Sequence, residues 1–318
     1  MSTVATEVPT PAVLCPEAPG PAGIPVIETV AEYSRALDAV RRSGRSVGVV
    51  PTMGALHAGH RSLVERAARE CDVVAVSIFV NPTQFGDAAD LALYPRTLEA
   101  DLEAVAQAGG QLVFAPSVAE MYPEAPGDIP MVSAPELADR WEGASRPGHF
   151  DGVATVVVKL LSAAGACRAY FGEKDFQQLA LVRWVVRDRS LPTEVVGCET
   201  VRQRDGLALS SRNTRLSAEQ RRAALVLSRA LRSGAAMMAG GEERPAVIEE
   251  QMARVVAREP AVALDYAALV HADDLEPAST CATSRPLRLL IAADVGPVRL
   301  IDNLDPRGWA PTTLHLSA

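Results

Sequence analysis

The sequence predicts an α/β fold in which a doubly wound parallel sheet is followed by a smaller α+β domain. Up to about residue 200, short apolar runs alternate with segments whose apolar residues recur every three or four positions, which indicates strands alternating with helices. Beyond residue 200 the alternation ends, and two helical patterns precede three strand-like runs. Strand–helix–strand units connect by right-handed crossovers, so the first region should be a parallel sheet with helices on both faces.

The apolar runs of the first region are nearly continuous, as in parallel strands that are covered on both faces. The expected strands cover residues 46–50, 73–80, 112–115, 169–171 and 194–197. The expected helices cover residues 30–43, 61–70, 98–106, 153–161 and 179–187. Together these elements predict one Rossmann-like domain over residues 25–200. Residues 1–24 are rich in proline and alanine, lack the basic segment of a secretory signal, and are expected to form a disordered tail.

Residues 201–318 are expected to form the smaller α+β domain, which would act as a C-terminal lid. Ser217 and Gln220 have the spacing of a capping box and would start a long, alanine-rich helix, with a second helix over about 246–258. The expected strands of this region cover residues 266–270, 287–292 and 298–302. The Gly-Pro pair at 296–297 indicates a turn between the last two, which would therefore be antiparallel.

The composition excludes several classes of function. The chain has 318 residues with 31 basic and 39 acidic side chains, a formal net charge of −8, so no nucleic-acid partner is predicted. No apolar stretch reaches the roughly 18 residues that a transmembrane helix needs, so no membrane partner is predicted either. The five cysteines are scattered without a CxxC pair, which favours a reducing, cytoplasmic location. The histidines lack metal-ligand spacing, and no metal site made of protein ligands alone is predicted.

Four polar clusters follow predicted strands at their carboxyl ends, where ligands bind in open α/β sheets. The clusters are PTMGALHAGH at 51–60, NPTQF at 81–85, GEKDFQQ at 172–178 and LSSRN at 209–213. Because the carboxyl ends of parallel strands share one edge of the sheet, these clusters should meet in one cleft.

The residue types in the clusters favour a nucleotide. His57 and His60 begin a helix, where backbone N–H groups and the helix dipole attract anions. Lys174, Arg212 and paired serines add donors that suit a triphosphate, whereas the amide side chains suit a substrate rich in oxygen. Neither lysine of the chain follows a glycine, and no GxGxxG is present, so neither a P-loop nor that dinucleotide motif is predicted.

Each feature also has a purely structural interpretation. Histidines can pack or be solvated, Ser/Arg loops are common, Gln177 and Gln178 fit the exposed start of a helix, and the segment 146–150 fits a packed turn. The combination of all four clusters at strand ends is what favours a binding site.

Six motifs, taken in their order along the chain, resemble those of one family. They are PTMGALHAGH, VNPTQF, YPRT, RPGHFDGVATVV, FGEKDFQQL and LSSRN. The HxGH segment with a downstream serine-rich basic loop resembles the nucleotidyltransferase and class I aminoacyl-tRNA synthetase superfamily. Within it, the whole set, from about residue 25 to residue 310, resembles the pantoate–β-alanine ligases, or pantothenate synthetases.

The resemblance implies a two-step reaction and a role for each matching residue. Pantoate would attack the α-phosphorus of ATP to form pantoyl adenylate and pyrophosphate, and β-alanine would then give pantothenate and AMP. The implied catalytic residues are His57, His60 and Lys174. The implied ATP-binding residues are Met53, His60, Gly172, Lys174, Asp175, Val201, Ser210, Ser211 and Arg212. The implied pantoate- and β-alanine-binding residues are Gln84, Gln178, Asn81, Tyr94, Glu142 and Arg146. Mg²⁺ would arrive with ATP, held by phosphate oxygens and water, and the family implies a homodimer.

Two alternatives remain at this point. One is another HxGH adenylyl- or cytidylyltransferase, whose product would keep the nucleotide, and the other is a regulatory nucleotide-binding module without catalysis. A tRNA synthetase is disfavoured by the acidic charge and the short region after residue 200. Leu209 stands where the family often has Met. The chain has only two lysines, of which Lys159 is expected at the solvent edge of its helix, whereas Lys174 falls in a strand-end cluster.

Overall fold

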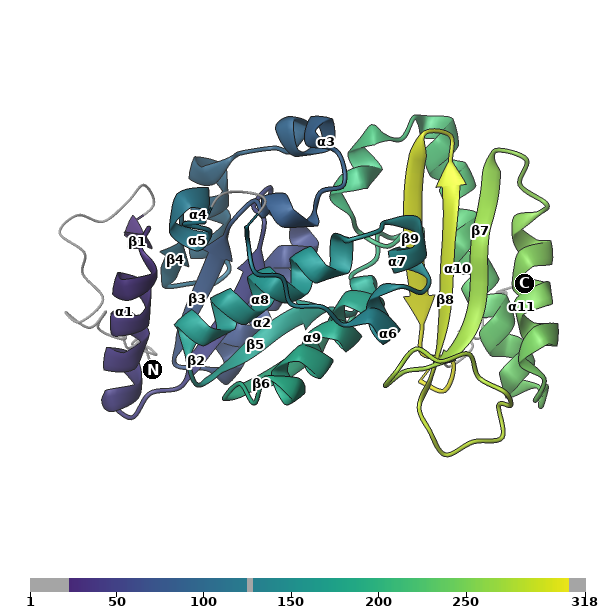
Figure 1. The fold of residues 1–318 in the computed structure, drawn as a ribbon. Helices are drawn as coiled ribbons and strands as arrows, with labels where there is room; N and C mark the ends of the chain where they lie inside the picture. Colours follow the sequence, from purple (N-terminus) through teal and green to yellow (C-terminus); the bar gives the residue numbers. More distant parts are fainter. Residues whose placement is uncertain (1–22, 125–127, 309–318) are drawn as a thin grey trace, which may run out of the picture.

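The protein has two lobes, each built around its own sheet (Figure 1). The computed structural model describes residues 23–124 and 128–308. A six-stranded sheet with helices forms the N-terminal lobe, and a three-stranded sheet with two long helices forms the C-terminal lobe. The predicted fold class is confirmed.

The N-terminal sheet is parallel throughout, with the strand order β1-β4-β3-β2-β5-β6. Its strands are β1 (Val26–Ile27), β2 (Val47–Thr52), β3 (Val73–Ile78), β4 (Leu112–Phe114), β5 (Cys167–Gly172) and β6 (Thr193–Cys198). From β2 the chain winds first toward β3 and β4 and later toward β5 and β6. The carboxyl ends of β2 and β5 therefore flank a topological switch point, where ligands bind in sheets of this class.

Helices cover both faces of this sheet, as predicted. The long helices of the lobe are α1 (Val30–Arg42), α2 (Ala58–Glu70), α4 (Leu98–Gln107), α8 (His149–Ala164) and α9 (Phe176–Asp188). Successive strand residues point to opposite faces. Val49 and Ala75 accordingly belong to the core beneath α1, α8 and α9, whereas Val50 and Val76 belong to the core beneath α2 and α4. Both faces are apolar, which explains the lack of alternation in the strand sequences.

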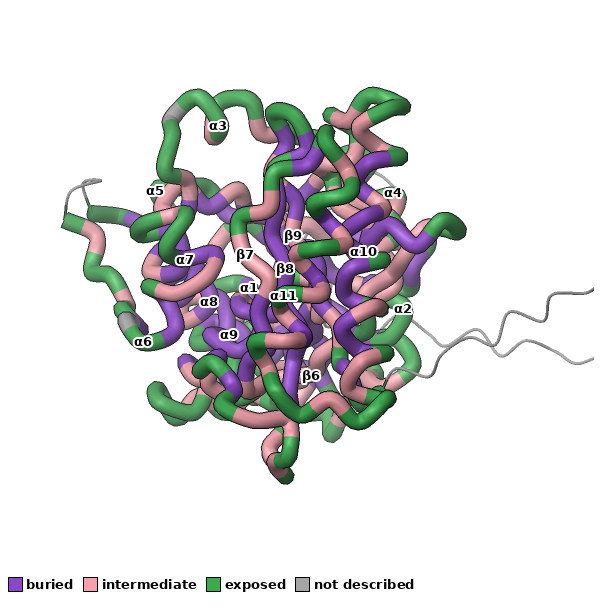
Figure 2. Tube along the Cα trace, turned by 90° about the vertical axis from the view of Figure 1, so that its right-hand side faces the viewer, coloured by how far each residue is buried: buried purple, intermediate pink, exposed green. Residues whose placement is uncertain are grey.

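The C-terminal sheet is antiparallel, in the order β7-β8-β9. Its lobe contains α10 (Ala218–Ala239), α11 (Pro245–Val256), β7 (Val262–His271), β8 (Leu287–Val295) and β9 (Val298–Leu304). Val295 pairs with Val298, so the predicted Gly-Pro pair forms a two-residue hairpin turn, and Gly296 has a φ of 58° there. One face of the sheet packs on α10 and α11, and Leu290 on the other face joins the core of the N-terminal lobe. Figure 2 shows buried residues along β8 and exposed residues in the surrounding loops.

The short elements were not predicted, because segments of a few residues show no periodicity. They are β1, α3 (Ala88–Leu93), α5 (Val118–Met121), α6 (Pro135–Ala138), α7 (Glu142–Ser145) and the 3₁₀ turns η3 (Pro82–Gln84), η4 (Glu173–Asp175) and η5 (Ser211–Arg215). β7 begins before the predicted residue 266, because a register irregularity between Leu264 and Tyr266 interrupts its pattern.

The predicted tail lies outside the described residues as far as position 22. A domain boundary near residue 200 stays a prediction; it falls between the end of β6 at Cys198 and the start of α10 at Ala218. Among the helices that the structure describes, none has the length and apolar character to cross a bilayer.

Candidate active site

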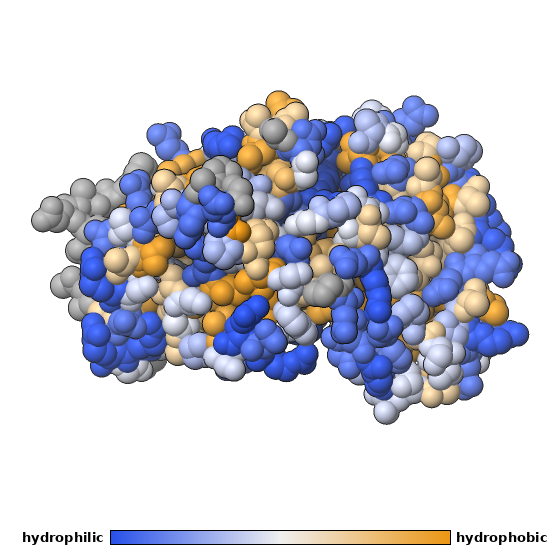
Figure 3. Space-filling view, in the orientation of Figure 1, coloured by the Kyte–Doolittle hydropathy of each residue, from blue (hydrophilic) through white to orange (hydrophobic). Residues whose placement is uncertain are grey.

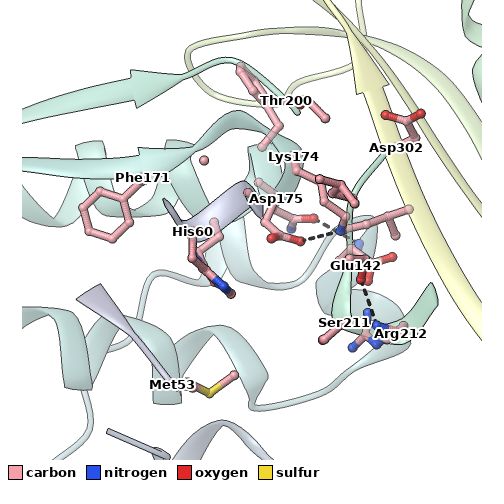
Figure 4. Close-up of a pocket in the computed structure, with 18 of the residues that line it drawn as sticks. Met53, His60, Glu142, Phe171, Lys174, Asp175, Thr200, Ser211, Arg212 and Asp302 are labelled. Carbon is pink, nitrogen blue, oxygen red and sulfur yellow. Dashed lines mark hydrogen bonds and ion pairs between the residues drawn. The ribbon is translucent and has the colours of Figure 1, made fainter. Parts of the chain in front are cut away.

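A cavity of about 610 Å³ lies where the carboxyl ends of the N-terminal strands face the C-terminal lobe. The predicted site residues that line it are Met53, His57, His60, Gln84, Tyr94, Glu142, Arg146, Gly172, Lys174, Asp175, Gln178, Val201, Ser210, Ser211 and Arg212. Asn81 is the predicted residue that does not. In Figure 4, Met53 and His60 lie on one side of the space, and Lys174 and Arg212 lie toward the other. Figure 3 shows a notch in the lower outline of the molecule where the lobes meet.

His57 and His60 build the N-terminus of α2. The Nδ1 atom of His57 accepts the Gly59 N–H at 3.1 Å, and the Nδ1 atom of His60 accepts the His57 N–H at 3.4 Å. The two rings stack with their centroids 4.1 Å apart. A Cβ atom at Gly59 would lie 2.9 Å from the His57 ring, so glycine permits this close approach.

Both imidazoles are neutral at pH 7. Burial, and after it the neighbouring His57, lowers the pKa of His60 to about 4, and burial together with the charge of Lys174 lowers the pKa of His57. A neutral imidazole carries one N–H, and since each Nδ1 accepts a hydrogen bond, the proton resides on Nε2. The pair therefore has two Nε2–H groups to donate.

Asp101 holds the loop that leads into α2. Its buried carboxylate accepts the N–H groups of Ala55 at 3.0 Å and Leu56 at 2.7 Å, and the hydroxyl of Thr97 at 3.1 Å. Ala55 has a φ of 52°, which is uncommon for a residue with a side chain, and these charged hydrogen bonds stabilise it. Sequence analysis missed Asp101 because it lies on α4, in no recognisable motif and more than forty residues from the loop.

Asn81 follows β3 and braces Gln84 from behind the cavity. Its Oδ1 atom accepts the Tyr122 hydroxyl at 2.7 Å, and its Nδ2 atom donates to the Gly152 carbonyl at 3.1 Å and to Gln84 Oε1 at 3.0 Å. With Gln84 Oε1 held in this way, Gln84 Nε2 lies 2.9 Å from Met53 Sδ at the cavity. In this structure the polar atoms of Asn81 are used within the protein, and Gln84 is the residue of the two that lines the cavity.

His149 fixes Arg146 in the cavity wall. The Nδ1 atom of His149 lies 2.8 Å from the carbonyl oxygen of Gln84, which can only accept, so Nδ1 carries the proton. Its Nε2 atom then accepts from Arg146 at 3.0 Å. Burial and the charge of Arg146 lower the pKa of His149 to about 4. The segment treated as a possible packed turn is thus a turn whose histidine orients an arginine.

Glu142 lines the cavity with its charge already compensated. Its carboxylate forms an ion pair with Arg299 of β9, which also lies 2.7 Å from Asp265. The Tyr266 hydroxyl donates to Glu142 at 3.4 Å. Glu142 therefore joins the two lobes at the edge of the cavity.

The neighbouring glutamines of α9 have different surroundings. Gln177 donates to the carbonyls of Leu137 at 2.7 Å and Arg140 at 2.8 Å, and it accepts the Glu142 N–H at 3.0 Å. Gln178 lines the cavity. Gln177 also borders the cavity, but it is 5% exposed and its amide is used within the protein, so the expected exposed start of a helix is wrong for Gln177. Gln178 stays a predicted site residue.

Lys174 and Asp175 lie in η4, directly after β5. Lys174 Nζ is 3.3 Å from Asp175 Oδ1. The surrounding protein opposes ionisation of Asp175, but the charges of Lys174 and Arg212 outweigh it and lower the pKa of that carboxyl. The pair places an ammonium and a carboxylate side by side on the cavity wall.

The serine-rich loop forms η5 on the C-terminal side of the cavity. Ser210 Oγ accepts the Arg212 N–H at 3.2 Å and thereby caps the turn. The Leu209 N–H donates to the Val201 carbonyl at 2.9 Å. Leu209, which stands where the family often has Met, also lines the cavity.

Two arginines of the cavity wall favour an anionic ligand. The carboxylates of Glu142 and Asp302 are each paired with an arginine, whereas Arg146 and Arg212 form no ion pair with a carboxylate among the described residues. Within that same part of the chain, no group of three His, Cys, Asp or Glu residues could hold a metal ion. A cleft at the switch point, with these two arginines and a helix N-terminus in its wall, is typical of α/β proteins that bind phosphorylated nucleotides.

Comparison with known proteins identifies the family within this class. The family model described as pantoate-beta-alanine ligase matches residues 25–305, and the chain belongs to that family. A pantothenate synthetase of Rubrobacter xylanophilus is 52% identical over 268 residues, which cover 83% of this chain and 92% of the relative. The resemblance read from the sequence motifs is confirmed.

Solved structures of the family share the fold. A pantothenate synthetase from Thermus thermophilus is similar with a TM-score of 0.81 and 47% identity, covering 89% of this chain and 99% of that one. A pantoate-beta-alanine ligase from Francisella tularensis, complexed with β-γ ATP and β-alanine, has a TM-score of 0.70 and 33% identity, covering 90% of this chain and 99% of that one. These matches span both lobes.

Proposed function

We propose that this chain condenses (R)-pantoate with β-alanine, driven by cleavage of ATP and by way of pantoyl adenylate, to give pantothenate, AMP and pyrophosphate. The main support is one cavity that joins phosphate-binding groups to an amide-lined pocket. The phosphate-binding groups come from the N-terminus of α2, from Lys174 and from η5. The amide-lined pocket is formed by Gln84 and Gln178. The reaction follows the family to which the chain belongs.

In the first step, an oxygen of the pantoate carboxylate would bond to the α-phosphorus of ATP. The bond from that phosphorus to the bridging oxygen would break, and pyrophosphate would leave with the electron pair. The carboxylate is already ionised and needs no base. The Nε2–H groups of His57 and His60 and the ammonium of Lys174 would stabilise charge developing on the phosphate oxygens.

The nucleotide would lie between the lobes. Ser210, Ser211 and Arg212 would bind the triphosphate, with Arg212 as a forked donor. The remaining proposed contacts of ATP are Met53, Gly172, Asp175 and Val201. Mg²⁺ would enter as MgATP, since magnesium is commonly held by phosphate oxygens and water, and the Asp175 carboxylate is the nearby oxygen donor.

Pantoate would occupy the amide-lined side of the cavity. Gln84 and Gln178 would bind its hydroxyls and carboxylate, with Asn81 holding Gln84 in place. Burial and the nearby Asp101 raise the pKa of Tyr94, so its hydroxyl stays protonated and able to donate. Arg146 and Glu142 would face the charged ends of β-alanine.

In the second step, the amine of β-alanine would bond to the acyl carbon of pantoyl adenylate. The amine would attack in its uncharged form, the bond between that carbon and the phosphate oxygen would break, and AMP would leave with the electron pair. The proton that the amine loses would pass to solvent. A cavity enclosed by both lobes would limit hydrolysis of the reactive anhydride.

The family resemblance also supports a homodimer, which the molar mass in solution would test. The described cysteine thiols Cys71, Cys167, Cys198 and Cys281 are free, and we propose a cytoplasmic location, where thiols stay reduced.

The experiment that tests this function is a product assay with each substrate omitted in turn. We expect AMP and pantothenate in equal amounts only when pantoate, ATP and β-alanine are all present. A transferase of another specificity would keep the nucleotide on its product, and a regulatory module would bind ATP without releasing AMP. Either result, or turnover without pantoate, would overturn the proposal.

A further inference from the structure

The C-terminal sheet binds the two backbone peptide groups that flank Lys174. Asn303, on β9, donates from Nδ2 to the carbonyl of Glu173 at 2.9 Å and to the carbonyl of Lys174 at 2.8 Å. Asn303 is 3% exposed, so these bonds form in a site that excludes water. Both N–H groups of one amide thus bind consecutive carbonyls of η4, the turn that carries Lys174.

The orientation of the Asn303 amide is itself fixed. Arg288, on the neighbouring strand β8, donates from Nε to Asn303 Oδ1 at 2.7 Å. A second guanidinium nitrogen of Arg288 donates to the Glu173 carboxylate at 2.9 Å, and the guanidinium lies 4.2 Å from the centroid of the Phe176 ring. Because Arg288 can only donate, Asn303 must present its oxygen to Arg288 and its N–H groups to η4.

We infer that Asn303 is a positioning residue, which sets the place of the Lys174 ammonium from the C-terminal lobe. A side chain that begins on a fixed peptide has fewer positions to adopt, and transition-state stabilisation depends on donors that are already in place. The cleft would then be fully assembled only when β9 is docked against η4. This inference rests on the proposed role of Lys174, and it adds that a residue of the C-terminal lobe helps to place this lysine.

The test is a double-mutant cycle measured in the first half-reaction. Asn303→Asp keeps the size of the side chain and an acceptor for Arg288, but removes both donors to η4. We expect the rate of pantoyl adenylate formation to fall at least ~10-fold in Asn303→Asp, and to change less than ~2-fold when the same substitution is made in Lys174→Ala. Asn303→Ala provides a second variant should Asn303→Asp fold poorly.

Glu276→Gln is the matched control, because it removes the ion pair between Glu276 and Arg140, whose atoms lie 2.6 Å apart, and that pair also joins the lobes. It should leave the rate and the unfolding temperature unchanged. Amide hydrogen exchange at residues 173–176 gives a readout that does not require turnover, and it should rise in Asn303→Asp but not in the control. Equal effects of Asn303→Asp with and without Lys174, or unchanged exchange at 173–176, would overturn the inference. A wild-type enzyme that forms no adenylate would instead overturn the proposed function.

Discussion

The imidazoles of His57 and His60 stack 4.1 Å apart, and the Nδ1 atom of each accepts a backbone N–H group at the start of α2. Capping the helix therefore fixes the tautomer of both rings, with the proton on Nε2. The atoms that build the helix cap and the atoms left for a ligand are different, so substitutions can separate stability from catalysis.

The first prediction concerns His60. In His60→Asn, Oδ1 can replace Nδ1 as the acceptor for the His57 N–H, but no group replaces Nε2–H. We expect adenylate formation to slow by roughly 10²–10³-fold, the usual effect of losing one transition-state donor, while thermal unfolding changes little. Single-turnover rates together with unfolding temperatures check this. A folded His60→Asn protein with wild-type rates would remove His60 from the mechanism.

The second prediction concerns Lys174. Lys174→Ala should lower turnover by roughly 10²–10³-fold. Lys174→Arg should restore little of it, because a planar guanidinium does not replace a compact ammonium at a crowded phosphate. Steady-state kinetics of the two variants, with folding verified, provide the measurement. Rates close to wild type in Lys174→Ala would show that the residue is incidental.

The third prediction separates the two substrates. Gln84→Ala should raise the KM for pantoate by about 10-fold or more, since an unpaired polar group costs about 1–3 kcal/mol, and it should leave ATP binding intact. Titration of ATP and pantoate by calorimetry distinguishes the two. Loss of ATP binding would move Gln84 to the nucleotide side of the cavity.

The fourth prediction extends this to the brace behind Gln84. Tyr122→Phe removes the hydroxyl that donates to Asn81 at 2.7 Å without opening a cavity. We expect a smaller rise in the KM for pantoate, in the same direction, with kcat for saturating substrate nearly unchanged. A rise in the KM for ATP, with the KM for pantoate unchanged, would contradict the proposal that Tyr122 and Asn81 hold Gln84 in place.

The fifth prediction is a dependence of stability on pH. Burial lowers the pKa of His149 from its ordinary 6.5 to about 4 in the folded protein. Between these values the unfolded chain binds a proton that the folded chain does not, so stability falls as the pH falls from 6.5 toward 4. The slope for one such group is at most about 1.4 kcal/mol per pH unit. His149→Asn keeps a donor for the Gln84 carbonyl and should flatten the curve, as unfolding at several pH values would reveal; an unchanged slope would contradict it.

The elements that the sequence predicted are helices with a period of apolar residues and strands that form a continuous apolar run. Val49 and Val50 face opposite cores, so their strand reads as an apolar run, and its partners along the chain read likewise. The short helices between residues 88 and 145 have no such pattern. The strand-end clusters were predicted to converge because parallel strands share an edge, and they do.

The supporting residues could not be read from the sequence, because their partners are distant in the chain. Asp101 binds the loop at 55–56, and Asn303 binds carbonyls about 130 residues away. The sequence also does not show where a side chain points. Asn81 lies in a matching motif, yet its amide points toward Gly152 and Gln84. Lys159, expected at a solvent edge, is half-buried, and its Nζ atom lies 5.4 Å from the centroid of the Tyr122 ring, a contact that no sequence pattern indicates.

The central claim is that an acyl adenylate forms in this cavity, and transfer of oxygen tests it most directly. Pantoate labelled with ¹⁸O in both carboxylate oxygens would be converted with ATP and β-alanine, and the products analysed by mass spectrometry. If the carboxylate attacks the α-phosphorus, each AMP carries one ¹⁸O atom and the amide carbonyl of pantothenate keeps the other. Unlabelled AMP formed together with pantothenate would contradict the account.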